Sequence, residues 1–263
     1  MEIGANEIFD FFDELADVAG RAVMPYFQTE LTIEDKGHGR FDPVTAADRA
    51  CELALRAAIS RRYPSHSIAG EEYGEHIGNA SVKWVIDPID GTRSFMSGIP
   101  LWGTLIAVCE RGVPTFGMMS QPYIGERFIG GQGHATWRRG AQSRDLKTRS
   151  TSRLSAASLF ATSPDMFDPA HEAASFSKLA GQVRMTRYGA DCYAYCALAA
   201  GHIDLVVEAG LGFHDIAAVA PIIESAGGVV TDWDGQPVRG GGAVIAAANR
   251  TLHQQALAVL GSI

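Results

Sequence analysis

The sequence predicts a mixed fold, with an α+β first half and a second half of α/β character. Three observations predict it: apolar residues at helical spacing near the start, β-rich runs between residues 103 and 137, and alternating strands and helices after residue 152. Hydrophobic residues make up 46% of the chain and charged residues 20%, so the chain can bury a sizeable core. We expect one domain over residues 1–263, with halves at about 1–150 and 151–263.

The chain is expected to open with a helix. Apolar side chains recur at helical spacing from Ile8 to Tyr26, which predicts an amphipathic helix over residues 6–27. Asn6 is a residue type that caps helices, because its side-chain oxygen can accept a hydrogen bond from a free backbone N–H of the first turn. We therefore expect Asn6 to cap this helix.

A second helix is expected between Thr45 and Pro64. The stretch Thr45-Ala-Ala-Asp48 has the form of a capping box, in which two side chains satisfy free N–H groups of the first turn. Proline cannot continue a helix, so the helix should end before Pro64. Residues 82–86 then form an apolar run that predicts a buried strand.

The β-rich runs 104–109 and 113–119 flank a short polar turn, which predicts an antiparallel hairpin. Residues 128–129 and 135–137 should extend the same sheet. The polar stretch 138–152 is expected to be a loop.

Shorter strands and helices should alternate after this loop. Strands are expected at 157–162, 183–187, 203–208 and 228–231, and helices near 169–180, 190–200, 214–226 and 250–261. Pro221 lies inside the third of these helices and should kink or shorten it, because proline lacks an N–H donor.

The formal net charge of −8 argues against a surface for nucleic acid or anionic lipid. The first residues are acidic rather than basic, and no apolar run approaches the ~20 residues that span a bilayer. These features predict a cytoplasmic protein that binds neither nucleic acid nor membrane. One local basic run is expected to be a solvated loop: Arg138, Arg139, Arg144, Lys147 and Arg149.

Four scattered cysteines, at positions 51, 109, 192 and 196, fit reduced thiols better than a disulfide framework. Cys192 and Cys196 are four residues apart in an expected helix, so they could share a metal ion. Core packing is the favoured interpretation, because no second Cys/His pair lies nearby in the sequence.

The most informative segment runs from Trp84 to Thr92, where an apolar strand leads into Asp87-Pro-Ile-Asp90. Two carboxylates leaving one strand end can converge on a hard cation, and Mg²⁺ prefers oxygen ligands. The rigid proline can also present the Ile89 carbonyl as a ligand. Gly91 would let the backbone pass close to a bound phosphate.

Other acidic residues have both a functional and a structural interpretation. Glu71 and Glu72 follow Gly70 and can be ligands or solvated loop charges. Asp215 follows His214 and can be a ligand or a helix cap, and Asp48 can act in catalysis or only complete the capping box.

Taken together and in this order, these segments resemble the signatures of the inositol monophosphatase family. The signatures are Gly-Glu-Glu at 70–72, Asp-Pro-Ile-Asp-Gly-Thr at 87–92 and Asp-x-Ala-Ala at 215–218, and the resemblance also includes Asp-x-Val-Thr-x-x-Asp from Asp42 to Asp48. It implies a layered αβαβα sandwich of the inositol monophosphatase and fructose-1,6-bisphosphatase type. It also implies a homodimeric phosphomonoesterase that acts on a small phosphorylated metabolite.

The resemblance implies roles residue by residue. One Mg²⁺ ion would be held by Glu71, Asp87 and the Ile89 carbonyl. A second would be held by Asp87, Asp90 and Asp215. A third, weaker ion would lie near Glu71. The implied catalytic residues are Glu71, Asp48 and Thr92, of which Asp48 and Thr92 would orient the attacking water. The implied substrate-binding residues are Gly91, Thr92, Gly189, Asp191 and Glu208. A site with two Mg²⁺ ions can activate water and neutralise the leaving alkoxide.

Residues 91–104 and 121–127 resemble the histidinol-phosphatase branch, so histidinol phosphate is the expected substrate. Inositol 1-phosphate, or another small sugar or nucleotide phosphate, is the alternative. Asp191 and Glu208 would offer charged partners to an ammonium and an imidazole, although Asp191 can instead cap its helix. His214 departs from the tryptophan usual in the family and should pack the turn, or else touch a leaving group.

Two other classes of protein share some of these features. A phosphatase of the haloacid-dehalogenase type places its two aspartates two positions apart, whereas Asp87 and Asp90 are three apart. A protein that binds RNA or a transcription complex is the alternative from a different class, and it need not release phosphate.

Overall fold

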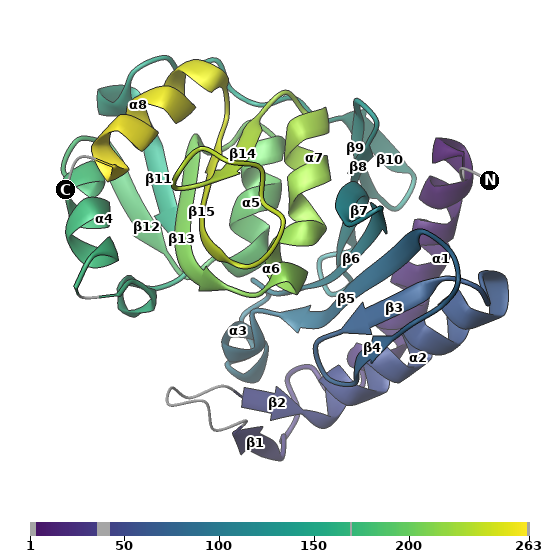
Figure 1. Ribbon diagram of the computed structural model, residues 1–263. Helices are drawn as coiled ribbons and strands as arrows, with labels where there is room; N and C mark the ends of the chain where they lie inside the picture. The colour runs from purple at the N-terminus through teal and green to yellow at the C-terminus, as the bar shows by residue number, and fades with distance from the viewer. Residues whose placement is uncertain (1–3, 36–42, 169, 262–263) are drawn as a thin grey trace.

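The chain is seen in a computed structural model that describes residues 4–35, 43–168 and 170–261. Asp42, the first residue of one predicted motif, lies outside the described residues. Helices and sheets alternate in layers across the molecule (Figure 1).

The larger sheet carries the predicted hairpin. In the described chain its order is β10-β9-β8-β7-β6-β5-β3-β4, and its pairs are antiparallel except that β3 lies parallel to β5. Its strands are β3 (Ser67–Gly70), β4 (Gly74–His76), β5 (Val82–Asp90), β6 (Gly103–Glu110), β7 (Val113–Gln121), β8 (Glu126–Gly131), β9 (His134–Arg139) and β10 (Gln142–Asp145).

Two predictions about this sheet have different outcomes. The β6–β7 hairpin is confirmed, and its turn residues Arg111 and Gly112 both have positive φ, as tight hairpin turns favour. The loop predicted over 138–152 is wrong in part, because Gln142 pairs with Arg139 and continues the sheet. These polar residues form an exposed edge strand, where a polar composition does not exclude pairing.

The smaller sheet is mixed, with the described order β12-β11-β13-β15-β14. Its strands are β11 (Ser158–Ala161), β12 (Met185–Tyr188), β13 (Leu205–Leu211), β14 (Val229–Asp232) and β15 (Gly242–Ala247). Strand β11 is parallel to β12 and β13, whereas β15 is antiparallel to β13 and β14. The four predicted strands are confirmed, and β15 was not predicted. A separate ribbon pairs β1 (Ile33–Asp35) with β2 (Pro43–Thr45).

The helices largely follow the predicted order. They are α1 (Ala5–Val23), α2 (Ala46–Arg62), α3 (Thr92–Met96), α4 (Glu172–Ala180), α5 (Asp191–Ala199), α6 (Phe213–Ala217), α7 (Val219–Ser225) and α8 (Arg250–Leu260), with short 3₁₀ turns at Leu154–Ala156 and Pro164–Met166.

Two helix predictions need correction. Helix α1 starts after Gly4, which offers no side-chain cap, so Asn6 is not the cap, and the helix ends at Val23 rather than residue 27. The helix predicted over 214–226 is split at Ala218, and Pro221 then lies in the first turn of α7, where a missing N–H is tolerated.

Three apolar clusters separate the layers. One lies between the helices α1 and α2 and the large sheet, a second surrounds α5, α6 and α7 between the sheets, and a third joins the small sheet to α4 and α8. Strand β6 shows the alternation: Leu105 and Ala107 face the middle cluster, whereas Ile106 and Val108 face the cluster under α1 and α2. This order confirms the αβαβα layers.

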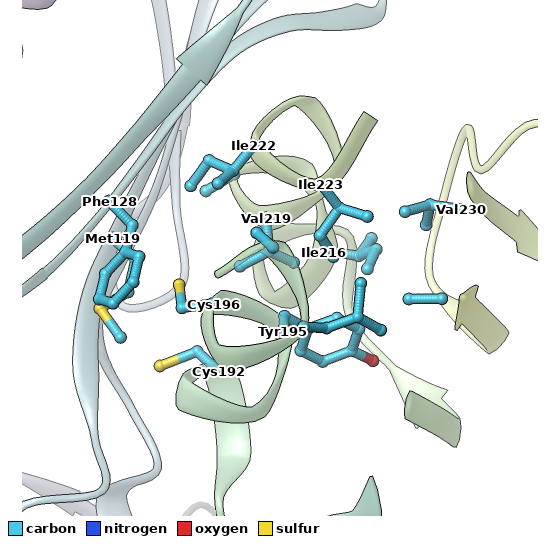
Figure 2. Close-up of a cluster of buried hydrophobic side chains, with 14 of the residues drawn as sticks. Met119, Phe128, Cys192, Tyr195, Cys196, Ile216, Val219, Ile222, Ile223 and Val230 are labelled. Atoms are coloured by element: carbon cyan, nitrogen blue, oxygen red, sulfur yellow. The ribbon is translucent and has the colours of Figure 1, made fainter. Parts of the chain in front are cut away.

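The middle cluster also confirms the prediction for the thiols. Cys192 and Cys196 are free and buried, and Figure 2 shows them on α5 beside Met119 and Phe128. They therefore pack as small apolar side chains. Within the described residues, no helix combines the length and the apolar character that crossing a membrane requires.

Candidate functional site

Strand β5 brings the first two acids together. It continues through Pro88 to Asp90 rather than ending at residue 86, with a register irregularity between Asp87 and Asp90 where proline cannot donate to the ladder. The Asp87 carboxylate accepts a hydrogen bond from the Ile89 N–H at 3.1 Å, and Thr104 donates to the Pro88 carbonyl at 2.8 Å. These bonds fix the backbone that carries both carboxylates.

Two more acids come from distant segments. Glu71 follows β3, and its N–H donates to the Ile86 carbonyl at 3.2 Å, which holds it beside β5. Asp215 lies in α6 and accepts from the Gly212 N–H at 2.7 Å, so it does cap its helix. Carboxylate oxygens of Asp87, Asp90 and Asp215 nevertheless lie within 4.8 Å of one another. Asp215 therefore caps its helix, and its position is also compatible with the predicted ligand role.

The electrostatics of this cluster suit a cation. Burial, and then the negative charges of Glu71, Asp90 and Asp215, raise the pKa of Asp87 well above its ordinary value. The pKa of Asp90 is raised by burial and by Asp215 and Asp191. Ligands of one octahedral Mg²⁺ ion lie roughly 3.0–4.2 Å apart. The donor set and its spacing therefore fit a divalent cation, which would relieve the repulsion.

His214 joins this cluster from α6. One of its ring nitrogens lies within 4.8 Å of carboxylate oxygens of Glu71 and Asp87, and its Nε2 lies 3.3 Å from Asp215 Oδ1. The ring folds over Gly212, where an added Cβ would fall 2.5 Å from the ring. His214 thus packs the turn, as predicted, and also faces the acids.

Asp48 and Thr92, the residues predicted to orient water, each have internal partners. Asp48 Oδ2 accepts from the Thr45 N–H and hydroxyl at 2.8 and 2.7 Å, which confirms the capping box. Burial, with smaller effects from the charges of Glu72 and Glu71, raises the pKa of Asp48 to about 6. The Thr92 hydroxyl donates to the Ile89 carbonyl at 3.0 Å.

No motif in the sequence predicts the role of Glu52, which lies one helical turn after Asp48 on α2. Its carboxylate is fully buried, accepts from the N–H groups of Glu72 and Tyr73 at 2.7 and 3.2 Å, and pairs with Arg56 at 2.7 Å. Glu52 therefore holds the turn that begins with Glu71. Its spacing of four from Asp48 is the one sequence signal for a shared helix face.

Gly91 and Asp191 lie against each other. Gly91 has a φ of +85°, and an added Cβ would lie 3.2 Å from the Asp191 Cγ, so glycine is required there. The helix-cap interpretation of Asp191 is wrong: the N-cap position of α5 is Ala190, and the Asp191 carboxylate accepts from the Ser94 hydroxyl at 3.0 Å. The acid that accepts from the first turn of α5 is Asp90, which takes the Cys192 N–H at 2.6 Å.

The other predicted substrate residues differ in accessibility. Glu208 is 2% exposed, and its two oxygens accept from the Thr162 N–H and the Tyr195 hydroxyl at 2.7 and 2.9 Å. Burial raises the pKa of Glu208 to about 7. Gly189 has a φ of +84° and faces open space.

A pocket of about 500 Å³ adjoins these residues. Its walls include Arg93 and Thr162. Burial raises the pKa of Asp191, and the charge of Arg93 partly offsets this effect. The Thr162 N–H donates to Glu208. Ser163 and Asp165 add polar groups to the same wall. Its size and its mixture of apolar and polar side chains suit a small ligand.

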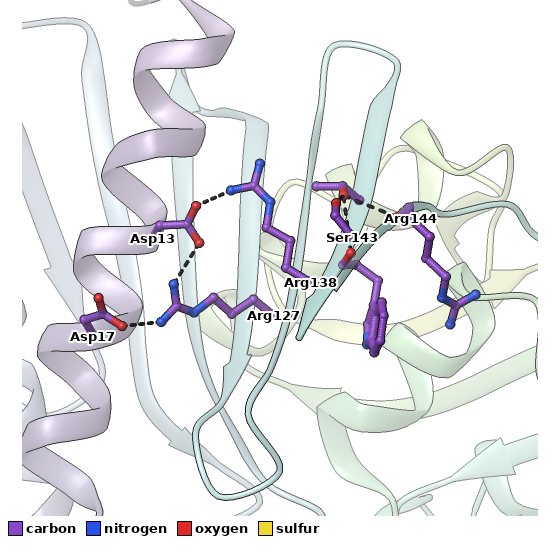
Figure 3. A network of polar contacts seen from close by, with 8 residues as sticks. Asp13, Asp17, Arg127, Arg138, Ser143 and Arg144 are labelled. Atoms are coloured by element: carbon purple, nitrogen blue, oxygen red, sulfur yellow. Dashed lines mark hydrogen bonds and ion pairs between the residues drawn. The ribbon is translucent and has the colours of Figure 1, made fainter. Parts of the chain in front are cut away.

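A larger pocket of about 720 Å³ lies away from the acids, between α1 and β7–β9. Figure 3 shows ion pairs among four of its charged side chains: Arg127 and Arg138 both bind Asp13, and Arg127 also binds Asp17. The prediction that Arg138 belongs to a solvated loop is therefore wrong. Because these charges satisfy one another, the smaller pocket is the better candidate for a ligand.

The chain is similar to known proteins over nearly its whole length. Residues 5–263 match the inositol monophosphatase family. The chloroplastic bifunctional phosphatase IMPL2 of Arabidopsis thaliana is 42% identical over 92% of this chain and 72% of its own length, and the histidinol-phosphatase of Streptomyces coelicolor is 36% identical over 95% and 98%. An inositol monophosphatase structure from Zymomonas mobilis superposes with a TM-score of 0.87 at 38% identity, covering 98% of this chain and 99% of that chain.

Proposed function

Because this chain belongs to the inositol monophosphatase family, whose members are phosphatases, we propose that it hydrolyses histidinol phosphate to histidinol and phosphate in a Mg²⁺-dependent reaction. The observation that carries the proposal is the convergence of Asp87, Asp90 and Asp215 within 4.8 Å, with Glu71 beside Asp87. Such a set of hard oxygen ligands suits Mg²⁺.

In this proposal Glu71, Asp87 and the Ile89 carbonyl hold one Mg²⁺ ion, and Asp87 shares a second with Asp90 and Asp215. A third, weaker ion would lie near Glu71. When bound, the ions supply the positive charge that activates water and neutralises the leaving oxygen.

The chain's own residues would orient the reactants. The Thr92 hydroxyl, held by the Ile89 carbonyl, and the Asp48 carboxylate would position the water. The backbone N–H groups of Gly91 and Thr92 would bind the phosphate, because first-turn N–H groups of a helix such as α3 have no partner within the helix.

The proposed substrate rests on the histidinol-phosphatase relative and on the charge beside the pocket. Asp191 is half-buried, accepts a hydrogen bond from Ser94 and lies beside Gly91, where its carboxylate can bind an ammonium or imidazole. Glu208 is a weaker candidate for direct contact, since both of its oxygens already have partners.

A change at Asp191 tests this specificity. Asp191→Asn should lower kcat/KM for histidinol phosphate by some tens-fold to a few thousand-fold, the effect of losing one partner of a buried charge pair. Turnover of glycerol phosphate, a neutral-alcohol ester, should fall far less. Asp145→Asn, at an exposed position on β10, is the control. An equal loss on both substrates would show that Asp191 supports the site generally.

Inositol 1-phosphate is the second candidate substrate, favoured by the similarity to the Zymomonas mobilis inositol monophosphatase. A phosphate-release panel of histidinol phosphate, inositol 1-phosphate, fructose 1,6-bisphosphate and adenosine 3′,5′-bisphosphate decides between them. Equal or faster release from inositol 1-phosphate would refute the histidinol branch. No Mg²⁺-dependent release from any of them would favour a binding protein. Homodimer formation is also proposed, and light scattering on the purified protein tests it.

A further inference from the structure

We infer that Glu71, Asp87 and His214 form a mixed oxygen–nitrogen metal position that favours a first-row transition ion such as Mn²⁺ over Mg²⁺, relative to the all-oxygen set of Asp87, Asp90 and Asp215. The inference rests on the proposed function, because it assigns one further ligand to the same metal site. It changes the metal selectivity expected for the position beside Glu71.

The geometry supports a shared position. A ring nitrogen of His214 and carboxylate oxygens of Glu71 and Asp87 lie within 4.8 Å of one another, close to the spacing of ligands around one ion. The His214 side chain is 31% exposed, so its ring can meet an ion that enters from solvent.

The backbone beneath the ring is also shaped for it. A Cβ at position 212 would lie 2.5 Å from the His214 Cε1, so a larger residue there would displace the ring. Asp215, the residue after His214, places its Oδ1 atom 3.3 Å from the His214 Nε2. A carboxylate beside one ring nitrogen can orient the ring of a metal-binding histidine.

The chemical consequence is a difference in selectivity between the two positions. Imidazole nitrogen binds transition ions well, whereas Mg²⁺ strongly prefers oxygen. A position that includes His214 should therefore gain more affinity for Mn²⁺ than for Mg²⁺. If His214 only orients Asp215, its removal should weaken the binding of both ions alike.

Pulsed electron paramagnetic resonance of the Mn²⁺-loaded, tag-free protein tests the inference, because a coordinated imidazole nitrogen modulates the Mn²⁺ echo. The His214→Phe variant keeps a flat ring over Gly212 but has no nitrogen. His134→Phe, at an exposed position on β9, is the matched control. Circular dichroism checks that each variant folds.

We expect nitrogen modulation in the wild type and in His134→Phe, and its loss in His214→Phe. Mn²⁺ affinity at this position should weaken by roughly tenfold or more in His214→Phe, and Mg²⁺ affinity by less. Wild-type protein carrying ¹⁵N-labelled histidine should show the shifted modulation frequency, and this test needs no variant to fold.

Three results would overturn the inference: no nitrogen modulation in the wild type, unchanged modulation in His214→Phe, or equal weakening of Mn²⁺ and Mg²⁺ binding. If any of these accompanies Mg²⁺-dependent phosphate release, the assignment of His214 fails and the phosphatase proposal stands. If the wild type neither binds Mn²⁺ nor releases phosphate, both fail.

Discussion

At the scale of single residues, Thr92 joins local structure to the proposed chemistry. Its hydroxyl donates to the Ile89 carbonyl at 3.0 Å, at the point where β5 turns into α3. A hydroxyl held in this way can aim a water molecule without contributing to the metal charge, and correct placement of a nucleophile lowers an activation barrier substantially.

Thr92→Ala should therefore fold and bind Mg²⁺ normally but release phosphate about 100-fold more slowly, because one positioning group near the reacting water is lost. Thr92→Ser keeps the hydroxyl and should recover most of the activity. Initial rates at saturating Mg²⁺, together with Mg²⁺ titration calorimetry, check both variants. Wild-type turnover in Thr92→Ala would show that Thr92 is only a turn residue.

Glu208 gives a prediction about pH and stability. Burial raises its pKa from 4.5 to about 7, so between these values the folded state keeps a proton that the unfolded state has lost. The stability contributed by this group therefore falls as the pH rises from about 4.5 to 7, and it does not return at higher pH.

Glu208→Gln removes the charge and can keep both hydrogen bonds. In metal-free buffer at pH 8 it should be more stable than the wild type by about 1–3 kcal/mol, with a smaller difference at pH 5. Urea unfolding at the two pH values measures this. A variant that is less stable at pH 8 would mean that ionised Glu208 is well compensated in the fold.

At the scale of elements, the turn after β3 is positioned by α2. Glu52 accepts the N–H groups of Glu72 and Tyr73, and Arg56 bonds both Glu52 and the Gly74 carbonyl. An added Cβ at Gly70 would lie 2.0 Å from the Glu52 carboxylate, so the turn and the helix fit closely only with glycine there.

Glu52→Gln should loosen this turn and with it Glu71. We expect Mg²⁺ affinity to weaken by about 10–100-fold, as for other groups that orient a ligand, while KM for the phosphate ester at saturating Mg²⁺ changes little. Glu34→Gln, which breaks the exposed pair with Arg49, is the matched control and should change neither quantity. A raised KM for the ester with normal Mg²⁺ affinity would contradict this positioning role.

Local signals predicted elements well where the partners are close in sequence. The Thr45 capping box and the turn at Arg111 and Gly112 depend on residues three or fewer positions apart, and both are confirmed. Strand β15 pairs with both β13 and β14, so its place depends on how the sheet assembles. Strand β10 pairs locally with β9, but its residues are polar and exposed and lack the alternation of a half-buried strand. Strand β5 runs past its predicted end at residue 86 to Asp90, because an irregular register accommodates Pro88.

At the scale of the whole molecule, the site is assembled from segments far apart in the chain. Asp87 and Asp215 come from opposite halves, and Asp90 accepts the Cys192 N–H from α5 across the same boundary. The signatures indicated which acids meet. No spacing in the sequence predicts the hydrogen bond from Ser94 to Asp191 or the bond from Tyr195 to the buried Glu208 carboxylate. These bonds form only when the two sheets pack around α5.

The central claim is that this acidic cluster binds the metal ions that phosphate release requires, and one measurement tests it most directly. Phosphate release from histidinol phosphate is followed during Mg²⁺ titration of metal-stripped wild type and Asp90→Asn, with circular dichroism as the check on folding. The account predicts release only after Mg²⁺ is added, and a rate at least roughly 100-fold lower in Asp90→Asn, which loses a metal-binding charge but can still accept the Cys192 N–H. Full turnover without Mg²⁺, or unchanged turnover in a folded Asp90→Asn, would contradict it.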